Sequence, residues 1–140
     1  MLEGTGNDAV RRMLADDRAS AGLGIELVEV TAGRAAARMT ITSAMVNGHG
    51  IAHGGFVFTL ADTAFACACN SYGPVAVAAG ADITFVAPAR EGDVLTATAQ
   101  ERVTYGRSGV YDVTVVRVDG DVIAEFRGRS RTIRREGEVK

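Results

Sequence analysis

One acidic residue interrupts the most apolar segment of this chain. Between residues 54 and 70, Asp62 is the single charged side chain, and at helical spacing Phe58 and Phe65 flank it one turn away on either side. Burying an unpaired carboxylate is costly, so such a residue needs a partner or a chemical task. A poorly hydrated carboxylate is also a better base or nucleophile. We therefore predict a catalytic acid at Asp62; the alternatives are a buried acid bonded to an amide or arginine, and a surface aspartate.

A glycine pair precedes this acid at the expected start of the same helix. The sequence His53-Gly54-Gly55 places the first helical amides where no side chain obstructs them. Such amides have no partner inside the helix and carry the positive end of its dipole. They suit an anion, or a carbonyl oxygen that becomes one during a reaction. We expect this helix start to bind such an oxygen, with a plain glycine cap as the alternative.

The polar residues before the helix have both structural and chemical interpretations. Asn47 is either a turn residue or an amide that orients a water or a carbonyl. His53 is expected to hydrogen-bond the turn or to help polarise a carbonyl. His49 and His53 have the i, i+4 spacing of helical metal ligands. The glycines on either side of His49 disfavour a helix there, and no third ligand is evident, so we expect no metal.

Distance then constrains how the two features cooperate. Gly54 and Asp62 are eight positions apart, which is about 12 Å along a helix. One carbonyl group cannot touch both in the same chain. If both act on one bond, the acid and the oxygen-binding amide come from different subunits, which predicts a dimer with two shared sites. The small residues Ala61, Ala64 and Ala68 would let this helix pack closely against a sheet or a partner.

The elements that must position these groups follow from periodicity and turn residues. A first helix is predicted over residues 7–19, which Asn7 or Asp8 can cap. Apolar alternation between turn signals predicts strands over residues 25–30, 35–42, 75–86, 94–105, 110–118 and 122–133. The long helix starts at Gly54, and Gly73-Pro74 is expected to close it.

This order of elements predicts an α+β domain. Strands joined by short turns pair mostly antiparallel, in a sheet of five to six strands. A helix of about eighteen residues is about 27 Å long, enough to cross such a sheet. We therefore expect the sheet to wrap around one long central helix.

Composition excludes several classes of function. A chain of 140 residues is expected to form a single domain, residues 1–140. Its net charge of −2 gives no reason to expect nucleic acid or a membrane as a partner. No apolar run is long enough to span a bilayer, and the first residues lack the core of a signal peptide, so a cytoplasmic location is expected. Cys67 and Cys69 are expected to be small buried hydrophobes.

Several of these residues also form a recognisable pattern. Asn47-Gly48, His53-Gly54-Gly55 and residues 60–64 (LADTA), with Phe85-Val86-x-Pro88 and residues 108–112 (SGVYD), resemble hotdog-fold acyl-CoA thioesterases of the phenylacetic acid degradation (PaaI) type. The resemblance covers nearly the whole chain. It implies an antiparallel sheet wrapped around the helix, dimers, and commonly homotetramers built as dimers of dimers.

The resemblance also implies roles for single residues. Gly54 would donate the backbone bond to the oxyanion, supported by Asn47 and His53, with Gly55 in the substrate-binding helix start. Asp62 of the partner subunit would act as general base or nucleophile, and Thr63 would help to place the water or the acid. No cofactor is implied, because coenzyme A is part of the substrate. In several relatives a hydroxyl lies on the strand after the helix, whereas residues 75–81 contain none.

Arginine side chains are natural partners for the phosphates of coenzyme A. The candidates are Arg90, Arg107, Arg127 and Arg129. We select Arg107 and Arg129 as substrate-binding residues. Arg127, Arg129 and Arg131 alternate along one predicted strand, so a solvated strand face is the alternative.

The activity implied by the resemblance is hydrolysis of acyl-CoA thioesters, with aryl-acetyl-CoA such as phenylacetyl-CoA or its hydroxylated derivatives as the expected substrate. A non-catalytic acyl-CoA-binding or sensor protein on the same fold is the alternative. Such a protein needs the pocket but not the acid, so Asp62 counts against it. A hydratase or dehydratase is a third possibility, but these enzymes pair an acid with a histidine in another motif.

Overall fold

Six strands form one sheet within the part of the chain that the computed structural model describes, residues 5–133. In chain order they are β1 (Glu26–Thr31), β2 (Arg34–Thr40), β3 (Ala76–Phe85), β4 (Val94–Tyr105), β5 (Ser108–Arg117) and β6 (Val122–Thr132). In space the order is β1-β2-β4-β5-β6-β3, and every neighbouring pair is antiparallel. The predicted antiparallel sheet of five to six strands is confirmed.

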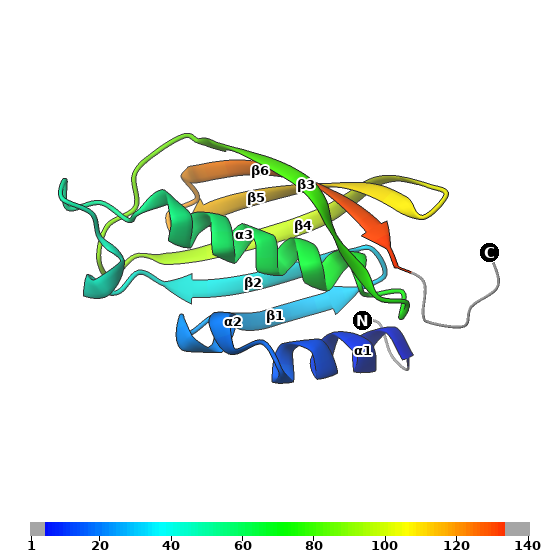
Figure 1. The fold of residues 1–140 in the computed structure, drawn as a ribbon. Helices are drawn as coiled ribbons and strands as arrows, with labels where there is room; N and C mark the ends of the chain where they lie inside the picture. The colour runs from blue at the N-terminus through cyan, green and yellow to red at the C-terminus, as the bar shows by residue number, and fades with distance from the viewer. Residues whose placement is uncertain (1–4, 134–140) are drawn as a thin grey trace.

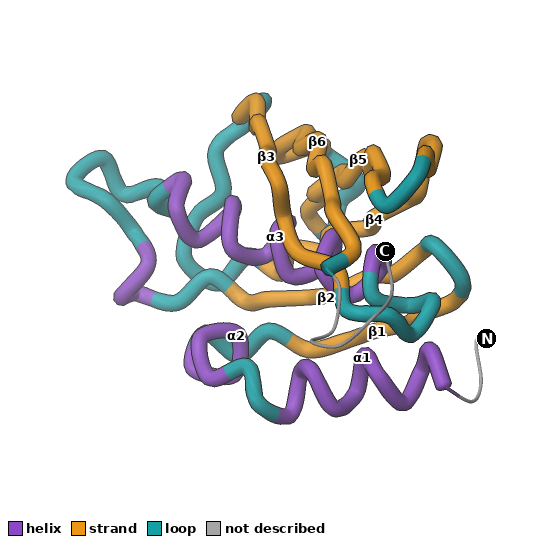
Figure 2. The backbone as a smooth tube through the Cα atoms, turned by 45° about the vertical axis from the view of Figure 1, so that its right-hand side comes forward, coloured by secondary structure: helices purple, strands orange, loops and turns teal. Residues whose placement is uncertain are grey.

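The helices lie against the concave side of this sheet and beside its β1 edge (Figure 1 and Figure 2). They are α1 (Thr5–Ala15), α2 (Arg18–Gly22) and α3 (Gly54–Cys69), with a short 3-10 helix, η1 (Ser43–Met45), after β2. Figure 1 shows α3 lying along the concave side of the sheet. Figure 2 shows how β3 on one side and β1 and β2 on the other enclose α3, while α1 runs outside, along β1. The predicted α+β arrangement, a sheet wrapped around one long helix, is confirmed.

Small side chains let α3 approach the middle of the sheet closely. Two pairs of buried alanines face each other across β2 and β4: Ala35 with Ala99, and Ala37 with Ala97. The face of α3 turned toward the core is equally small and has no exposed surface at Ala61, Ala64 and Ala68. These alanines therefore pack within the single chain, against the sheet.

Aromatic rings fill the wider space beside β5 and β6. The ring centroid of Phe65 lies 5.6 Å from that of Tyr111 and 5.8 Å from that of Phe126. Gly128 of β6 makes room for this cluster, because a Cβ atom there would come within 2.8 Å of the Phe65 ring. Alanines on one side and rings on the other thus fix the position of α3, including its catalytic candidates.

The predicted first helix, residues 7–19, is wrong as a single element. The chain forms α1 and then α2, with a break at Asp16 and Asp17. Asp17 caps α2: its Oδ1 accepts a hydrogen bond of 2.9 Å from the Ser20 amide. A side chain that satisfies the first free amides of a helix fixes a new start there, and this overrides the continuous apolar spacing.

The predicted close of the long helix at Gly73-Pro74 is also wrong. α3 ends at Cys69, and Asn70 provides the reason. The Asn70 Nδ2 atom donates to the carbonyls of Ala66 (2.9 Å) and Ala76 (3.0 Å), and its Oδ1 accepts from the Ala76 amide (2.9 Å). The Asn70 side chain thus takes the place of the next helical turn and connects the end of α3 to the first residue of β3.

The strand boundaries agree with prediction to within two residues. The largest differences, two residues each, are at the end of β2 and at the start of β5, which begins at Ser108 because Tyr105 pairs with it directly across a tight turn. Gly106 supports that turn with a positive φ of 59°. Among the described helices, none combines the length and the hydrophobicity that a bilayer span requires.

Candidate active site

The first amide of α3 is available to a ligand. His53 caps the helix, and its Nδ1 accepts a bond of 3.2 Å from the Gly55 amide. The His53 amide donates to the Met45 carbonyl at 2.7 Å, and the Phe56 amide donates to the His53 carbonyl at 3.0 Å. The Gly54 amide lies between these satisfied groups, and no described residue accepts its hydrogen bond. It therefore points an unused donor outward from the positive end of the helix dipole.

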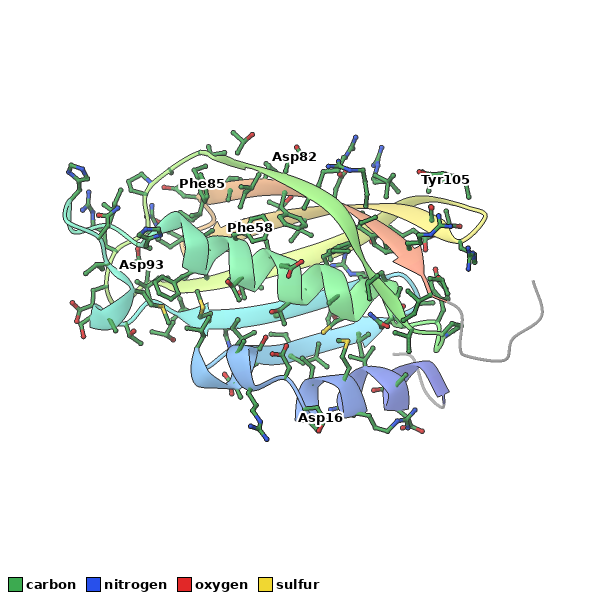
Figure 3. All side chains as sticks on the ribbon, in the orientation of Figure 1. Asp16, Phe58, Asp82, Phe85, Asp93 and Tyr105 are labelled. Atoms are coloured by element: carbon green, nitrogen blue, oxygen red, sulfur yellow. The ribbon has the colours of Figure 1, made fainter. Side chains whose placement is uncertain are left out.

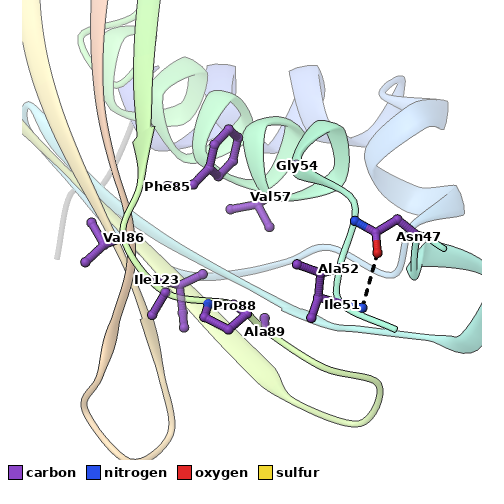
Figure 4. A pocket seen from close by; sticks show the side chains of 11 residues that line it. Asn47, Ile51, Ala52, Gly54, Val57, Phe85, Val86, Pro88, Ala89 and Ile123 are labelled. Atoms are coloured by element: carbon purple, nitrogen blue, oxygen red, sulfur yellow. Dashed lines mark hydrogen bonds between the residues drawn. The ribbon is translucent and has the colours of Figure 1, made fainter. Parts of the chain in front are cut away.

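A largely apolar pocket of about 480 Å³ opens beside this amide. Its walls come from the loop before α3, from α3 itself, from the segment that follows β3 and from β6, and they include Ile51, Val57, Phe85, Val86, Pro88 and Ile123 (Figure 4). Gly54 and Asn47 contribute its polar edge. A pocket with apolar walls and few polar groups suits an apolar acyl group with a reacting carbonyl at one end.

The ring of Phe85 leaves no room for a side chain at position 54. A Cβ atom at Gly54 would come within 2.7 Å of the Cζ atom of the Phe85 ring. That ring remains 53% exposed, so it covers one side of Gly54 while its other face is open. Any larger residue at position 54 would push the ring aside or occupy the space beside the free amide.

Asn47 holds the loop that forms the opposite wall. Its Oδ1 accepts bonds from the amides of His49 (2.9 Å) and Ile51 (3.3 Å), so the interpretation as a turn residue is confirmed. Figure 4 shows its side-chain nitrogen on the side nearer Gly54, with the oxygen turned to Ile51. Because the oxygen is used by the turn, the nitrogen is the atom that can donate into the pocket.

Asp62 is half-buried, and α3 is not buried on all sides within the single chain. One stripe of the helix stays partly open, and it consists of Gly55, Phe58, Thr59, Asp62 and Ala66. Burial raises the pKa of Asp62, and the negative charge of Asp17 raises it further. Both effects favour a carboxylate that takes up a proton readily. A raised pKa fits the predicted base but does not assign the role.

The structure does not bring Asp62 and Gly54 together within one chain. Asp62 is absent from the walls of the pocket beside Gly54. It is also absent from a second opening of about 630 Å³ on the other side of the helix start, between α2 and the residues His53, Gly55, Phe56 and Thr59. The free amide and the perturbed acid thus face different spaces, as expected from their separation along α3.

Thr63 is turned away from the open stripe. Its side chain is buried, and its Oγ1 lies 2.9 Å from the Ser20 Oγ and 2.9 Å from the carbonyl oxygen of Thr59. In this position the hydroxyl faces α2 rather than either pocket. Thr63 can therefore support the turn that carries Asp62, whereas direct contact with a water near Asp62 would require another rotamer.

The two arginines selected for the phosphates lie away from the Gly54 pocket. Arg129 donates to the Asp82 carboxylate at 3.0 Å, from β6 to β3; Figure 3 shows Asp82 on the outer side of the strand. Arg107 sits in the turn between β4 and β5 and lines a small polar pocket near the end of α3, with Tyr72. Among the described residues, Arg107 has no ion pair.

The remaining candidate ligands are dispersed. Within residues 5–133, no three histidine, cysteine, aspartate or glutamate side chains gather to hold a metal ion. Cys67 and Cys69 are free and buried, and burial raises the pKa of both thiols to about 12. Thiols of that kind are unreactive, which agrees with their expected role as small hydrophobes.

The sequence of residues 49–124 matches a family described as the Thioesterase superfamily. That span contains the helix start, Asp62 and the strands β3, β4 and β5, and it covers more than half of the chain. This chain belongs to the thioesterase superfamily.

Individual relatives place this thioesterase more closely. It is 46% identical over 121 residues to the acyl-coenzyme A thioesterase PaaI of Escherichia coli (strain K12), with 86% of each chain covered. The solved structure of the E. coli PaaI protein superposes with a TM-score of 0.91 at 43% identity, covering 93% of this chain and 94% of that one. A mutant structure of the phenylacetic acid degradation protein PaaI from Thermus thermophilus gives a TM-score of 0.80 at 33% identity, covering 84% of this chain and 100% of that one. The predicted hotdog fold and family are confirmed.

Sequence reasoning missed two residues near the candidate site of this thioesterase. Phe85 enters the sequence analysis only as part of a motif, because nothing local links the end of β3 to the start of α3. Asp17 falls within the predicted first helix, where nothing marks it as a residue near the site. Aspartate is a preferred helix cap, so Asp17 could have indicated a second helix start, although not its proximity to Asp62.

Proposed function

We propose that this protein hydrolyses acyl-CoA thioesters, with aryl-acetyl-CoA such as phenylacetyl-CoA or its hydroxylated derivatives as the preferred class. The observation that carries the proposal is the free Gly54 amide at the mouth of an apolar pocket, on the same helix as a half-buried acid whose pKa is raised. The names of the similar proteins, acyl-coenzyme A thioesterase and phenylacetic acid degradation protein, support the substrate class.

In the proposed reaction the Gly54 amide binds the thioester carbonyl oxygen. Asp62 removes a proton from water, which attacks the carbonyl carbon; the developing oxyanion is held by the amide and by the helix dipole. The tetrahedral intermediate then collapses and breaks the bond from carbon to sulfur, and the departing sulfur takes up the proton held by Asp62. The acid and the thiol of coenzyme A are released, and Asp62 is again a carboxylate. In the alternative route, Asp62 attacks the carbonyl itself and water hydrolyses the resulting anhydride. His53 and Asn47 hold the oxygen-binding loop in both routes.

The minimal active unit in this proposal is a homodimer with shared sites. β3 is an end strand of the sheet, pairs only with β6, and exposes Val77 (44%) and Phe85 (53%). A long apolar edge of this kind is ready to pair with another strand. A second copy paired along β3 would cover the open stripe of α3 as well. Asp62 of each copy would then meet the Gly54 amide of the other, and two such dimers would form the implied homotetramer.

Two arginines and two free cysteines bear on how coenzyme A is bound and where the protein acts. Arg107 and Arg129 are proposed to bind its phosphates, with Arg107 the more available because Arg129 already pairs with Asp82. An Arg107→Gln variant should raise KM for acyl-CoA and leave KM for a short pantetheine thioester unchanged. No cofactor is proposed. A cytoplasmic location fits the two free thiols, which are typical of a reducing compartment.

The activity test compares wild type with Asp62→Asn on phenylacetyl-CoA and on straight-chain acyl-CoA, with detection of the free thiol. The variant should lose about 10²- to 10⁴-fold in kcat, the range of a general base. Wild type that is inert on every thioester, or full activity in Asp62→Asn, contradicts the proposal. Tight acyl-CoA binding without turnover would instead favour a binding or sensor protein.

The shared site has its own test. Asp62→Asn and Gly54→Ala chains, each impaired alone, are mixed after mild denaturation and refolding. If the acid and the amide come from different subunits, each mixed dimer contains one intact site, so activity returns to about a quarter of wild type. If both act within one chain, mixing restores nothing.

A further inference from the structure

A buried polar contact joins α2 to α3 next to the candidate base. The Ser20 Oγ and the Thr63 Oγ1 lie 2.9 Å apart, and the two side chains are only 4% and 6% exposed. Ser20 is also bonded to Asp17 twice: its amide reaches Oδ1 at 2.9 Å, and its hydroxyl reaches Oδ2 at 2.6 Å. A chain of hydrogen bonds therefore runs from the connection between α1 and α2 to the middle of α3.

The protons in this chain have a direction. An ionised carboxylate only accepts, so the Ser20 hydroxyl donates its one proton to Asp17. The Ser20 oxygen is then left to accept from Thr63. The Thr63 proton is shared between Ser20 and the Thr59 carbonyl, which lies 2.9 Å away. Asp17 thus orients both hydroxyl groups, and through them it ties the turn of α3 from residue 59 to residue 63.

That turn carries Asp62. Thr63 is its immediate neighbour, and Asp62 projects from the same turn toward the open stripe of α3. The adjacent Asp16 is exposed and points away beneath α1 (Figure 3), so the inward direction is specific to Asp17. The charge of Asp17 also lies close enough to raise the pKa of Asp62, after the larger effect of burial.

We propose that Asp17, acting through Ser20 and Thr63, is a positioning residue for Asp62: the chain of hydrogen bonds fixes the turn that presents the carboxylate. The inference deepens the proposed hydrolysis and rests on Asp62 as the reacting acid. It also gives α2 a function, because this five-residue helix carries the hydroxyl that connects the two aspartates.

The groups that face Asp62 come from several elements. Asp17 faces it from the connection between α1 and α2, and within α3 the thiol of Cys69 lies in its field. No group from the strands is among the described charges that act on it. In the proposed dimer, the start of the second copy's α3 would face it too. Because that contribution is the same in every variant, differences between variants report on Asp17.

Three variants separate charge from position. Asp17→Asn keeps an equally good helix cap and an acceptor for Ser20 but removes the charge. Ser20→Ala keeps the charge but breaks the hydrogen-bond chain. Asp8→Asn removes an equivalent exposed charge from α1 and serves as the matched control. Circular dichroism and thermal unfolding establish that each variant is folded before comparison.

The first readout is independent of turnover: NMR titration of the Asp62 side-chain carboxyl carbon. Asp17→Asn should move the Asp62 titration to lower pH, while Ser20→Ala and Asp8→Asn leave it near wild type. The second readout is the pH profile of kcat. Because the base must be ionised, activity falls as pH drops through the Asp62 titration; in Asp17→Asn this acid limb should shift to lower pH.

Loss of the positioning of Asp62 should have a different kinetic effect from loss of the Asp17 charge. Ser20→Ala should lower kcat about 10-fold with KM and the acid limb unchanged, well within the roughly 100-fold that a misplacement of 1 Å can cost. Thr63→Ser, which keeps the hydroxyl, should stay near wild type, whereas Thr63→Val should match Ser20→Ala. If the Asp62 titration does not move in Asp17→Asn, or Ser20→Ala keeps full kcat, the inference is wrong. Asp62→Asn with full activity would instead defeat the proposed hydrolysis while the titration still reports on Asp17.

Discussion

The two ends of α3 are built in opposite ways. At its start, the Gly54 amide has no acceptor among the described residues, and an apolar pocket opens beside it. At its end, Asn70 and Ser71 are buried and bond the last carbonyls, the first residue of β3 and the Gly33 amide. One end therefore exposes the donor that a helix normally needs to satisfy, and the other end satisfies its groups within the chain.

The end of α3 thus contributes to the stability of the fold, whereas its start leaves a hydrogen-bond donor free for a ligand. An unsatisfied amide at a helix end is tolerated where solvent or a substrate oxygen can reach it. A helix end packed under the sheet has no such access, so side chains must supply the partners. We therefore expect changes at the start of α3 to affect catalysis, and changes at its end to affect folding.

Two glycines make the same contrast with an aromatic ring. A Cβ atom added at Gly54 would lie 2.7 Å from the exposed ring of Phe85. A Cβ atom added at Gly128 would lie 2.8 Å from the buried ring of Phe65. The exposed ring can swing away if a methyl group is added, whereas the buried ring cannot. The same substitution should thus have different consequences at the two positions.

The largest effect on stability is expected at the end of α3, where the polar groups are satisfied within the chain. Asn70→Ala removes three hydrogen bonds to backbone groups and leaves the buried amide and carbonyl of Ala76 without partners, which should lower the free energy of unfolding by about 3 kcal/mol. Urea unfolding measures this, and kcat per folded molecule at low temperature should be unchanged. Tyr72→Phe is the control at the same end, because it removes only an exposed bond to Glu101 and should cost about 0.5 kcal/mol. Equal losses in the two variants would contradict the comparison.

At the open end, Gly54→Ala should lower kcat/KM about 100-fold, equivalent to about 2.7 kcal/mol of transition-state stabilisation, while the melting temperature stays near wild type. The added methyl group displaces Phe85 or occupies the approach to the amide. Gly22→Ala is the control, since nothing lies within 4 Å of its would-be Cβ. Adding Phe85→Ala sharpens the result: recovery would assign the loss to the ring, and no recovery would assign it to the methyl group itself. A Gly54→Ala protein that is mainly unfolded would refute the contrast.

Gly128→Ala should act in the reverse sense. Its methyl group would collide with a buried ring, so the expected cost is about 2 kcal/mol of folding stability from overpacking. Thermal and urea unfolding measure this, with kcat of the folded fraction unchanged. Combining it with Phe65→Leu should cost less than the sum of the single changes, because the smaller side chain gives back room. Additive losses would show that the collision is not the cause.

Asp62→Asn should stabilise the protein at neutral pH while it removes activity. The pKa of Asp62 is raised above the ordinary 3.8, so the folded state binds the proton more tightly than the unfolded state does. Wild type therefore loses stability as pH rises through the folded pKa, and a neutral side chain avoids that loss. The gain in melting temperature should be present at pH 7–8 and disappear as pH falls toward 3.8. A gain that persists unchanged in acid would point to a different cause.

The smallest effect is expected on the outer face of the sheet. Asp112 accepts bonds of 2.7 Å and 3.0 Å from Arg127, and this guanidinium holds the pKa of the carboxyl below its usual range. Both side chains are more than a third exposed, so Asp112→Asn should cost less than about 1 kcal/mol. Because the pKa is lowered, the contribution is present above 3.8 and is lost as pH falls through the folded pKa. Unfolding in 1 M salt should show almost no difference between variant and wild type.

Patterns of spacing were enough to predict the strands and the helix start at Gly54, and they singled out Asp62 as a candidate. Each rests on neighbours within a turn or a hairpin: alternation for the strands, a glycine pair for the helix start, apolar flanks for the acid. The two wrong helix boundaries also have local causes. A helix stops where a side chain satisfies its end, so Asp17 and Asn70 set boundaries against the apolar spacing.

The sequence by itself thus determined the family and the α+β class, and it proposed Asp62 and Gly54 as reacting candidates, because these conclusions depend on residue type and short-range spacing. Only the tertiary structure decided which partners those residues meet. Phe85 covers Gly54, Ser20 joins Thr63, and Asp17 acts on Asp62, each across a long stretch of chain. Such contacts arise when the sheet closes around α3, and packing between distant segments leaves no periodic trace in the sequence. The same closure leaves the stripe of Asp62 open in one chain, where we propose that a second copy completes the site.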